Sequence, residues 1–368
     1  MRRVLVVEAS GDLWGSERAL LDMLDSMPTL EAAVCCPPER PLNGELARRQ
    51  IRALPYYVYA LHKKSRWHRL GAAVGVLRAC VEFRPDIIYL NQSGAYKVAL
   101  LAATLLNLPI VAHVRIFEDV AYLARQAPRP RRLRGLIAIS LAVEMEIRRF
   151  QELGTIPFYR IYDAYAPPSL PLLPSSTQRI ANRIACVGRL VPAKGLDVLV
   201  RAIGVLKSFD TGVECLIVGD GEGRFIQDLK QMASGGTFAA LIQWRGFVGD
   251  VVPLLRTCSV LAVPSHREPL GRVIFEAWDA GAIPVVFSGS GGAAEIVSAS
   301  VGGLLYDKQE PESLAAALRA ALELSQEQRA RLVDNGRSWM AKNCNPATYG
   351  AALSTILTKA CRPHSNRS

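Results

Sequence analysis

Two glutamates separated by seven residues, Glu268 and Glu276, have the spacing that best supports chemistry in this sequence. The apolar run Ser259–Val263, closed by Pro264, predicts a buried parallel strand, and the residues from about Arg272 predict a helix. Glu268 then lies in the loop at the carboxyl end of a strand, and Glu276 lies in the first turns of the helix. Ligands of open α/β sheets bind at that edge, and carboxylates accept hydrogen bonds from hydroxyl groups. The pair therefore indicates a polyol ligand, a sugar or a ribose, and its alternative is a loop charge beside a solvated helix face.

Two cations form the second candidate group. Arg189 and Lys194 flank a turn directly after the predicted strand Ile184–Gly188, so both can approach one point above the sheet. A diphosphate carries the doubled negative charge that this pair would neutralise, with a planar fork from arginine and a mobile point charge from lysine. Two unrelated surface cations are the alternative interpretation.

The pattern Pro-Ser-x-x-Glu-x-x-Gly-x-x-x-x-Glu-Ala at residues 264–277 resembles the carboxyl-terminal signature of retaining GT-B glycosyltransferases, the large family often called glycosyltransferase family 4. The resemblance implies that Glu268 contacts the transferred sugar and that Glu276 contacts the nucleotide ribose. Leu270 and Gly271 complete the expected donor site, although an aromatic residue is usual in place of Leu270. Trp278 and Asp279 also stand where smaller residues are usual.

Other segments extend this resemblance. Gly-Arg-Leu-x-x-x-Lys-Gly at residues 188–195 is similar to the diphosphate clamp of the family. Residues 243–248 match the family segment whose backbone contacts the nucleotide base, so Phe247 and Val248 are candidates for base binding. The turn at residues 9–18 resembles a Gly-Gly-x-Glu-Arg turn into a helix that begins near Ser16. Because helix amides receive phosphate, Gly15 is a candidate for close approach to the donor.

His113 lies at the end of the predicted strand Ile110–Val114, where ligands collect. A lone histidine at a strand end is usually structural, but a histidine at this place in the family lines the acceptor side. The candidate catalytic residues are therefore Glu268, Arg189, Lys194 and His113.

Strands alternate with helical stretches through the whole chain, which predicts an α/β class protein with doubly wound parallel sheets. At 368 residues the chain most simply makes two domains. Residues 166–176 contain four prolines, which predicts a linker, placed at 169–178, between an amino-terminal domain at 1–168 and a carboxyl-terminal domain at 179–344. The resemblance implies the GT-B fold, two Rossmann-like domains facing across a cleft, with residues 345–368 crossing back onto the first domain.

Several classes of function are disfavoured by the sequence. The eight cysteines show no metal-ligand spacing and are typical of reduced core thiols in a cytosolic protein. Gly219-x-Gly221-x-Gly223 lacks the spacing of a dinucleotide fingerprint, which argues against a nicotinamide or flavin. No Asp-x-Asp motif occurs, and the longest apolar run, Val98–Ala112, is too short to span a membrane. We therefore expect no cofactor and no metal, with the nucleotide-diphosphate sugar acting as donor substrate.

The resemblance implies a metal-independent hexosyltransferase that moves a sugar, with retention of configuration, from a nucleotide-diphosphate sugar to a carbohydrate or lipid-linked acceptor. Such an enzyme would serve polysaccharide or glycolipid biosynthesis. Two alternatives stay open, a nucleotide-sugar epimerase of the same fold and a non-catalytic sugar-nucleotide-binding subunit. Either a front-face route or a covalent intermediate on Glu268 would give retention.

The net charge of +11 is concentrated in residues 1–170, which carry 23 Lys and Arg against 16 Asp and Glu. Residues 61–70 interleave cations with Trp67, and residues 125–134 add five more. Basic residues attract anionic leaflets, and tryptophan prefers the interface. We therefore expect a cytoplasmic protein that associates peripherally with the inner face of the membrane; ordinary solvated loops are the alternative, and no nucleic acid is expected.

Overall fold

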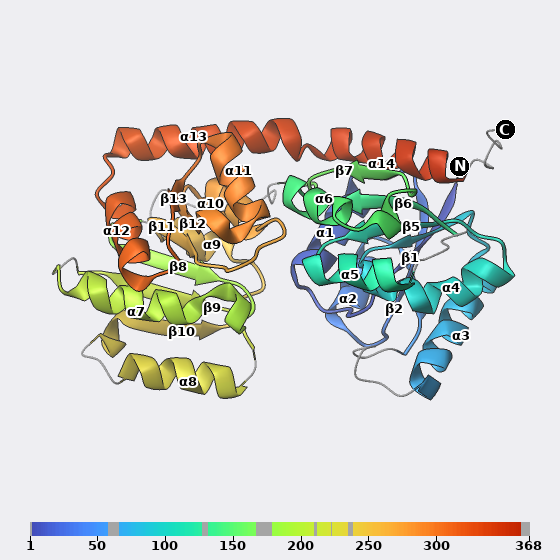
Figure 1. Ribbon diagram of the computed structural model, residues 1–368, viewed down its shortest axis with the longest axis horizontal. Coiled ribbons are helices and arrows are strands. Elements are labelled where there is room, and N and C mark those ends of the chain that lie inside the picture. The colour runs from blue at the N-terminus through green and yellow to red at the C-terminus, as the bar shows by residue number, and fades with distance from the viewer. Residues whose placement is uncertain are drawn as a thin grey trace. The chain divides into compact units, whose positions relative to one another are not determined.

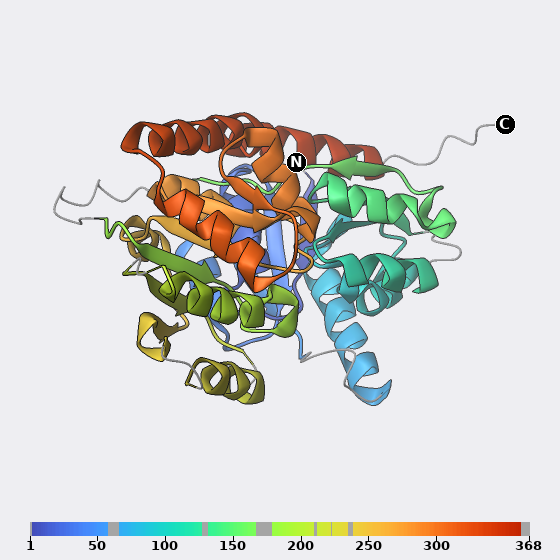
Figure 2. The same ribbon diagram turned by 60° about the vertical axis from the view of Figure 1, so that its left-hand side comes forward.

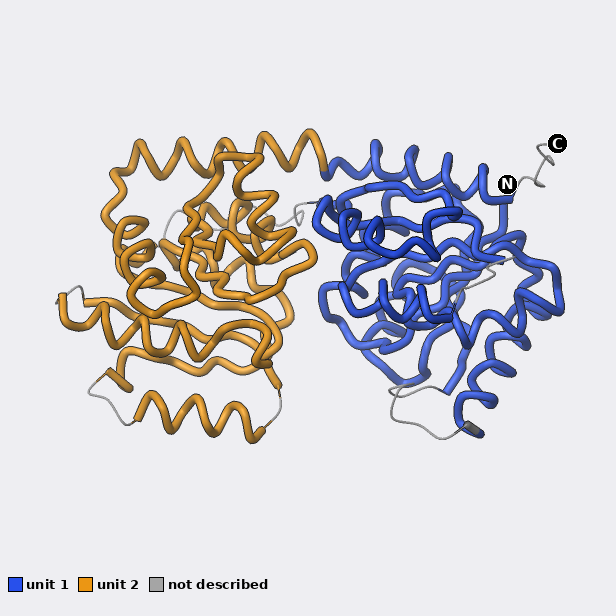
Figure 3. The backbone as a smooth tube through the Cα atoms, in the orientation of Figure 1, with its two compact units in different colours: residues 1–166, 344–368 blue, residues 167–343 orange. Residues whose placement is uncertain are grey.

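The computed structural model describes residues 2–57, 66–126, 132–166, 179–209, 212–221, 223–234 and 238–361. It divides into two compact units, residues 1–166 with 344–368 and residues 167–343 (Figure 3). The expected linker at 169–178 lies outside the described residues, as do residues 61–65 of the basic segment 61–70 and residues 127–131 of the segment 125–134.

Unit 1 contains a parallel sheet of seven strands in its described part, in the order β3-β2-β1-β4-β5-β6-β7. Helices cover both faces of the sheet (Figures 1 and 2). Its strands are β1 (Arg3–Val7), β2 (Glu31–Cys36), β3 (Arg52–Pro55), β4 (Ile87–Leu90), β5 (Ile110–Val114), β6 (Leu133–Ala138) and β7 (Phe158–Arg160). Its helices are α1 (Gly15–Asp25), α2 (Pro41–Arg48), α3 (Arg66–Phe83), α4 (Tyr96–Leu105), α5 (Phe117–Gln126), α6 (Leu141–Arg148) and α14 (Pro346–Ala360).

Unit 2 repeats this architecture with six described strands in the order β10-β9-β8-β11-β12-β13. Its strands are β8 (Arg183–Val187), β9 (Glu214–Val218), β10 (Ile242–Gly246), β11 (Val260–Val263), β12 (Ile283–Phe287) and β13 (Leu304–Tyr306). Its helices are α7 (Leu196–Lys207), α8 (Gly223–Ser234), α9 (Val252–Arg256), α10 (Val273–Ala280), α11 (Gly292–Ser300), α12 (Pro311–Leu322) and α13 (Gln326–Asn343).

The central strands are apolar runs because helices bury both of their faces. All four residues of β4 and of β11 are buried, as expected for parallel strands in doubly wound sheets. In both units the strand order reverses direction next to the first strand, between β1 and β4 and between β8 and β11. The chain therefore opens a crevice at the carboxyl ends of these strand pairs.

The expected α/β class and the two Rossmann-like units are confirmed. Within the basic segments, Trp67 to Leu70 lie in the first turns of α3, Arg125 lies in the last turn of α5, and Arg134 lies in β6. In the described chain no helix is both long and apolar enough to cross a membrane.

Trp278 has a structural explanation within unit 2. Its ring is fully buried against Trp339 of α13, and its Nε1 donates a hydrogen bond to the backbone oxygen of Gly302 (2.7 Å). A Cβ at Gly336 would lie 2.3 Å from the ring, so α13 carries a glycine at the point of contact. The bulky residue at position 278 therefore packs α10 against α13.

Candidate active site

The residues singled out in the carboxyl-terminal half converge on the crevice between β8 and β11. The loops that follow these two neighbouring strands line a small cavity. Its lining includes Gly188, Arg189, Lys194, Ser265 and Glu268. Two segments about 75 positions apart in the sequence thus form one polar site at the switch point of unit 2.

Lys194 and Glu268 form an ion pair at the centre of this site. The carboxylate of Glu268 also accepts a hydrogen bond from Ser265 Oγ at 3.2 Å. Glu268 is 8% exposed, so the lysine compensates a carboxylate that is largely withdrawn from water. The expected cation and the expected sugar-binding acid are therefore direct neighbours, which the sequence did not indicate.

Two glycine positions allow the close approach of these loops. Gly195 has a φ of +64°, and a Cβ there would lie 2.0 Å from the backbone oxygen of Pro264. Gly292 would place a Cβ 1.9 Å from the backbone oxygen of Pro269, and its N–H donates to the backbone oxygen of Glu268 (2.8 Å). Only glycine fits at such contacts, so both turns hold the acid loop in place.

The candidates of unit 2 other than Lys194 and Glu268 differ in exposure. Arg189 is exposed and Glu276 is half-buried on α10, whereas Leu270 is buried and can offer a ligand only its backbone. Gly271 has a φ of +84° and bends the chain into α10. Phe247 is 53% exposed just beyond β10, and Val248 is half-buried.

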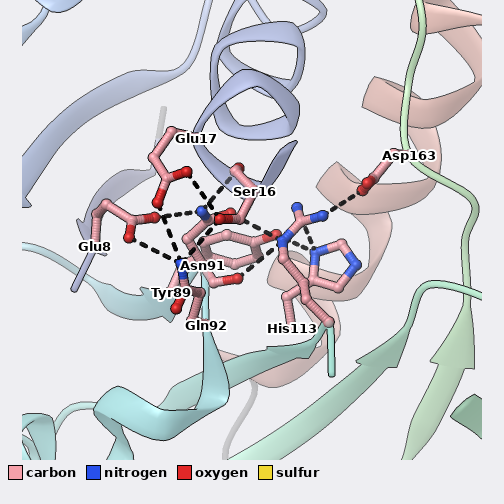
Figure 4. Close-up of polar contacts among 9 residues, drawn as sticks. Glu8, Ser16, Glu17, Tyr89, Asn91, Gln92, His113 and Asp163 are labelled. Carbon is pink, nitrogen blue, oxygen red and sulfur yellow. Dashed lines mark hydrogen bonds and ion pairs between the residues drawn. The ribbon is translucent and has the colours of Figure 1, made fainter. Parts of the chain in front are cut away.

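In unit 1, His113 belongs to a buried network at the end of β5. Its Nδ1 lies 2.6 Å from the hydroxyl of Tyr89 and 3.2 Å from a guanidinium nitrogen of Arg115, which also contacts Asp163 at 2.6 Å (Figure 4). A guanidinium can only donate, so Nδ1 accepts and Nε2 carries the proton. Burial, reinforced by the positive charge of Arg115, holds the pKa of His113 well below its usual value. Nε2 has no hydrogen-bond partner in the described part of the chain, which leaves a neutral N–H donor for a ligand.

Sequence reasoning missed a second polar cluster in unit 1, next to Gly15 at the exposed start of α1. Glu8 follows β1 and is fully buried, and Glu17 lies in the first turn of α1 with 1% exposure. The side-chain nitrogen of Gln92 lies 3.2 Å from Glu8 Oε1, 3.3 Å from Glu17 Oε1 and 2.9 Å from Ser16 Oγ (Figure 4).

The two carboxylates share this cluster without a cation. Glu8 also accepts backbone N–H groups from Ala9 (2.7 Å) and Ser10 (3.1 Å), and Glu17 accepts the N–H of Trp14 (3.1 Å). Among the described residues all the partners of both acids are amides, hydroxyls and backbone N–H groups. Burial, followed by the charge of Glu17, raises the pKa of Glu8 to about 8. The raised pKa favours the neutral form of Glu8, and the cluster fixes the turn that carries Gly15.

Residues 178–339 match the sequence model of the family described as Glycosyl transferases group 1. The matched segment contains the whole cavity between β8 and β11. Nearly the whole carboxyl-terminal unit therefore matches group 1 glycosyl transferases in sequence. The resemblance inferred from residues 188–195 and 264–277 is thereby confirmed.

Curated relatives of this domain are themselves named glycosyltransferases. A D-inositol 3-phosphate glycosyltransferase of Segniliparus rotundus is 33% identical over 180 residues, which is 46% of this chain and 40% of the relative. A GDP-mannose-dependent alpha-(1-6)-phosphatidylinositol monomannoside mannosyltransferase of Mycobacterium tuberculosis is 31% identical over 183 residues, 47% of this chain and 46% of the relative. The match thus spans less than half the length of these relatives.

The similarity of the fold extends over both units. The crystal structure of HepE from Anabaena in complex with UDP and glucose matches 97% of this chain and 100% of that chain, with a TM-score of 0.82 and 22% identity. The structural similarity therefore shows the GT-B fold.

Proposed function

We propose that this protein is a retaining glycosyltransferase that moves a sugar from a nucleotide-diphosphate sugar to a carbohydrate or lipid-linked acceptor. The observation that carries the proposal is the ion pair of Lys194 and Glu268 beside Arg189 at the switch point of unit 2. This site offers cations for a diphosphate and a carboxylate for sugar hydroxyls within one loop cluster. The relative that depends on GDP-mannose and the HepE complexes with UDP support a donor of this class.

Breaking the bond between the anomeric carbon and the diphosphate builds negative charge on the leaving oxygen. Lys194 and Arg189 stabilise that charge, and preorganised groups of this kind commonly contribute about 10² to 10³ in rate each. When the diphosphate binds Lys194, the ion pair between Lys194 and Glu268 opens. The carboxylate of Glu268 then accepts hydrogen bonds from hydroxyl groups of the sugar. Glu276, on the first turns of α10, accepts hydrogen bonds from the ribose hydroxyls, and the region of Phe247 and Val248 meets the base.

A front-face route accounts for retention. The leaving diphosphate helps to remove the proton of the incoming acceptor hydroxyl, and no separate nucleophile and acid are required. In unit 1, the neutral His113 donates its Nε2–H to a hydroxyl on the acceptor side. Donor binding uses no metal in this scheme, because the two cations already offset the leaving charge.

The acceptor belongs to polysaccharide or glycolipid biosynthesis in this proposal. One relative is named for a phosphatidylinositol monomannoside acceptor, and another, of Rhizobium meliloti, for lipopolysaccharide core biosynthesis. Such acceptors are carried on lipids, which agrees with the basic amino-terminal half and with peripheral association at the cytoplasmic face of the membrane.

Product analysis tests the proposal. The full chain is incubated with nucleotide-diphosphate sugars, with and without carbohydrate and lipid-linked acceptors, and the products are identified by mass spectrometry and by the anomeric proton coupling. We expect release of nucleoside diphosphate coupled to a new glycoside of unchanged anomeric configuration. A donor converted to its epimer without acceptor would identify an epimerase instead, and binding without turnover would identify a non-catalytic subunit.

A further inference from the structure

The outward face of α3 is apolar although it is exposed. Trp67 is 80% exposed, Leu70 49%, Val74 42% and Val81 59%. Their spacing of three, four and seven residues places them on one stripe of the helix, which we call the outer stripe. Four large apolar side chains on one helix face are more than the isolated exposed residues that soluble surfaces normally carry.

The opposite face of α3 is already used for packing. Ala72, Val76, Ala79 and Phe83 are buried against unit 1, and α3 packs along α4. A helix that is apolar on both sides is typical of a helix with two covered faces. The amino-terminal turns of α3 project beyond the rest of unit 1 in both views (Figures 1 and 2). Among the described residues of unit 1, the outer stripe therefore lacks a partner.

The charge around the outer stripe indicates what that partner is. No acidic residue occurs between Glu45 and Glu82 in the sequence, and Glu82 itself is paired with Arg52. Of the cations in this segment, Arg48 and Arg49 are paired with Glu45. Arg69 and Arg78 are exposed on α3 together with the stripe. A symmetric contact between two copies of α3 would bring these cations together. A surface that combines apolar insertion with excess positive charge fits an anionic lipid leaflet.

We propose that the outer stripe of α3 docks this protein on an anionic membrane surface, with Trp67, Leu70, Val74 and Val81 inserted between lipids and Arg69 and Arg78 at the headgroups. This docking surface rests on the proposed function, because a docked unit 1 presents the acceptor side to lipid-linked acceptors. It assigns the expected peripheral association to a defined helix face.

Co-sedimentation of the full chain with vesicles tests this proposal. Phosphatidylcholine vesicles with and without phosphatidylserine are compared at low and high salt. We expect binding only to the anionic vesicles, weakened by salt. The double variant Trp67→Ser, Val74→Ser should bind at least about tenfold more weakly, because both the apolar contact and the interfacial tryptophan are lost. The double variant Arg69→Glu, Arg78→Glu should lose binding to a similar extent.

Matched controls change equally exposed residues elsewhere. Met145→Ser on α6, at 55% exposure, and Arg201→Glu on the exposed surface of α7 should bind vesicles like the wild type. All variants should keep the wild-type melting temperature, since none of these side chains is buried. Wild-type binding that does not depend on anionic lipid, or stripe variants that bind as well as the controls, would overturn the proposal.

A stripe that instead mediates self-association would appear as a wild-type dimer that Trp67→Ser, Val74→Ser converts to a monomer without any vesicle binding, and this result also overturns the proposal. Nucleotide binding in solution distinguishes a failure of the docking surface from a failure of the proposed function. Loss of vesicle binding with intact nucleotide-diphosphate binding would contradict only the docking surface. Intact vesicle binding without any nucleotide binding would contradict the proposed function.

Discussion

The fold buries the carboxyl group of Glu8 completely, which favours its neutral form. Its pKa rises from 4.5 to about 8, mainly through burial and then through the charge of Glu17. The folded state therefore binds this proton more tightly than the unfolded state, and the stability that it contributes is full below about pH 4.5. That contribution is lost as the pH rises through about 8, with a slope of at most about 1.4 kcal/mol per pH unit for one proton.

We expect Glu8→Gln to flatten this pH dependence, because the amide resembles the neutral acid and does not titrate. Thermal unfolding of the wild type and the variant at pH 6 and pH 9 measures the effect. Between pH 6 and pH 9 the melting temperature should fall clearly more in the wild type than in Glu8→Gln. Parallel decreases in the two proteins would mean that Glu8 is already ionised at neutral pH.

The two glutamates of unit 2 should separate binding from turnover. Glu276→Ala should weaken nucleotide binding by about tenfold or more, because charge-assisted hydrogen bonds to the ribose contribute about 1.5–3 kcal/mol. Glu268→Ala should leave nucleotide binding largely intact and suppress transfer of the sugar. Calorimetry and a coupled assay for released nucleoside diphosphate measure both effects, with the exposed Glu312→Ala on α12 as control. The reverse pattern would exchange the two roles.

The residues that sequence reasoning found and missed differ in a physical way. Glu268 and Lys194 stand in turns marked by glycine and proline, and such turns can be recognised in the sequence. Glu8, Asn91 and Gln92 each follow a buried strand, but a charged or amide residue there reads as solvated. They meet only because β1 and β4 are neighbours in the sheet, and strand order is not visible in local sequence. A glutamate directly after a buried strand, with Asn-Gln after another, was the available signal.

At the scale of elements, the site depends on loops that pass each other at backbone contact. Gly195→Ala adds a Cβ that would lie 2.0 Å from the backbone oxygen of Pro264, at a φ of +64° that alanine rarely adopts. We expect unit 2 to lose about 1–3 kcal/mol of stability and the donor affinity to fall with it. Thermal unfolding and nucleotide titration measure both.

Gly223→Ala at the start of α8 is the matched control, because an added Cβ there meets nothing within 4 Å. Its stability should equal or slightly exceed that of the wild type. If Gly195→Ala behaved like this control, the loops after β8 and β11 would not be held in the close contact that the structure describes.

Elements were predicted best where strands are buried on both faces. The central strands β4 and β11 are continuous apolar runs, and β1, β5 and β8 contain one polar residue each, so that period and turn signals identify them. The edge strand β3 was missed because three of its four residues are exposed, and β7 because it has only three residues. The polar helix α13 was missed for a similar reason, since only Val333, Gly336 and Met340 are buried along its length.

For the molecule as a whole, each unit places its polar cluster at the switch point of its own sheet. Unit 2 carries the cations and acids of the proposed donor site, and unit 1 carries the Nε2–H of His113 and the turn at Gly15. The ion pair between Lys194 and Glu268 could be found only in the three-dimensional structure. The proposed function requires that the cations of unit 2 bind a diphosphate.

Calorimetric titration of the full chain with UDP, GDP, ADP and dTDP, each compared with its nucleoside, tests this claim most directly. We expect at least one diphosphate to bind about a hundredfold or more tightly than its nucleoside, since both cations contact only the diphosphate. Arg189→Ala and Lys194→Ala should each weaken that diphosphate by about 1.5–3 kcal/mol and leave the nucleoside unchanged, whereas Arg201→Ala should match the wild type. Equal binding of nucleoside and diphosphate, or unchanged diphosphate affinity in both variants, would contradict the account.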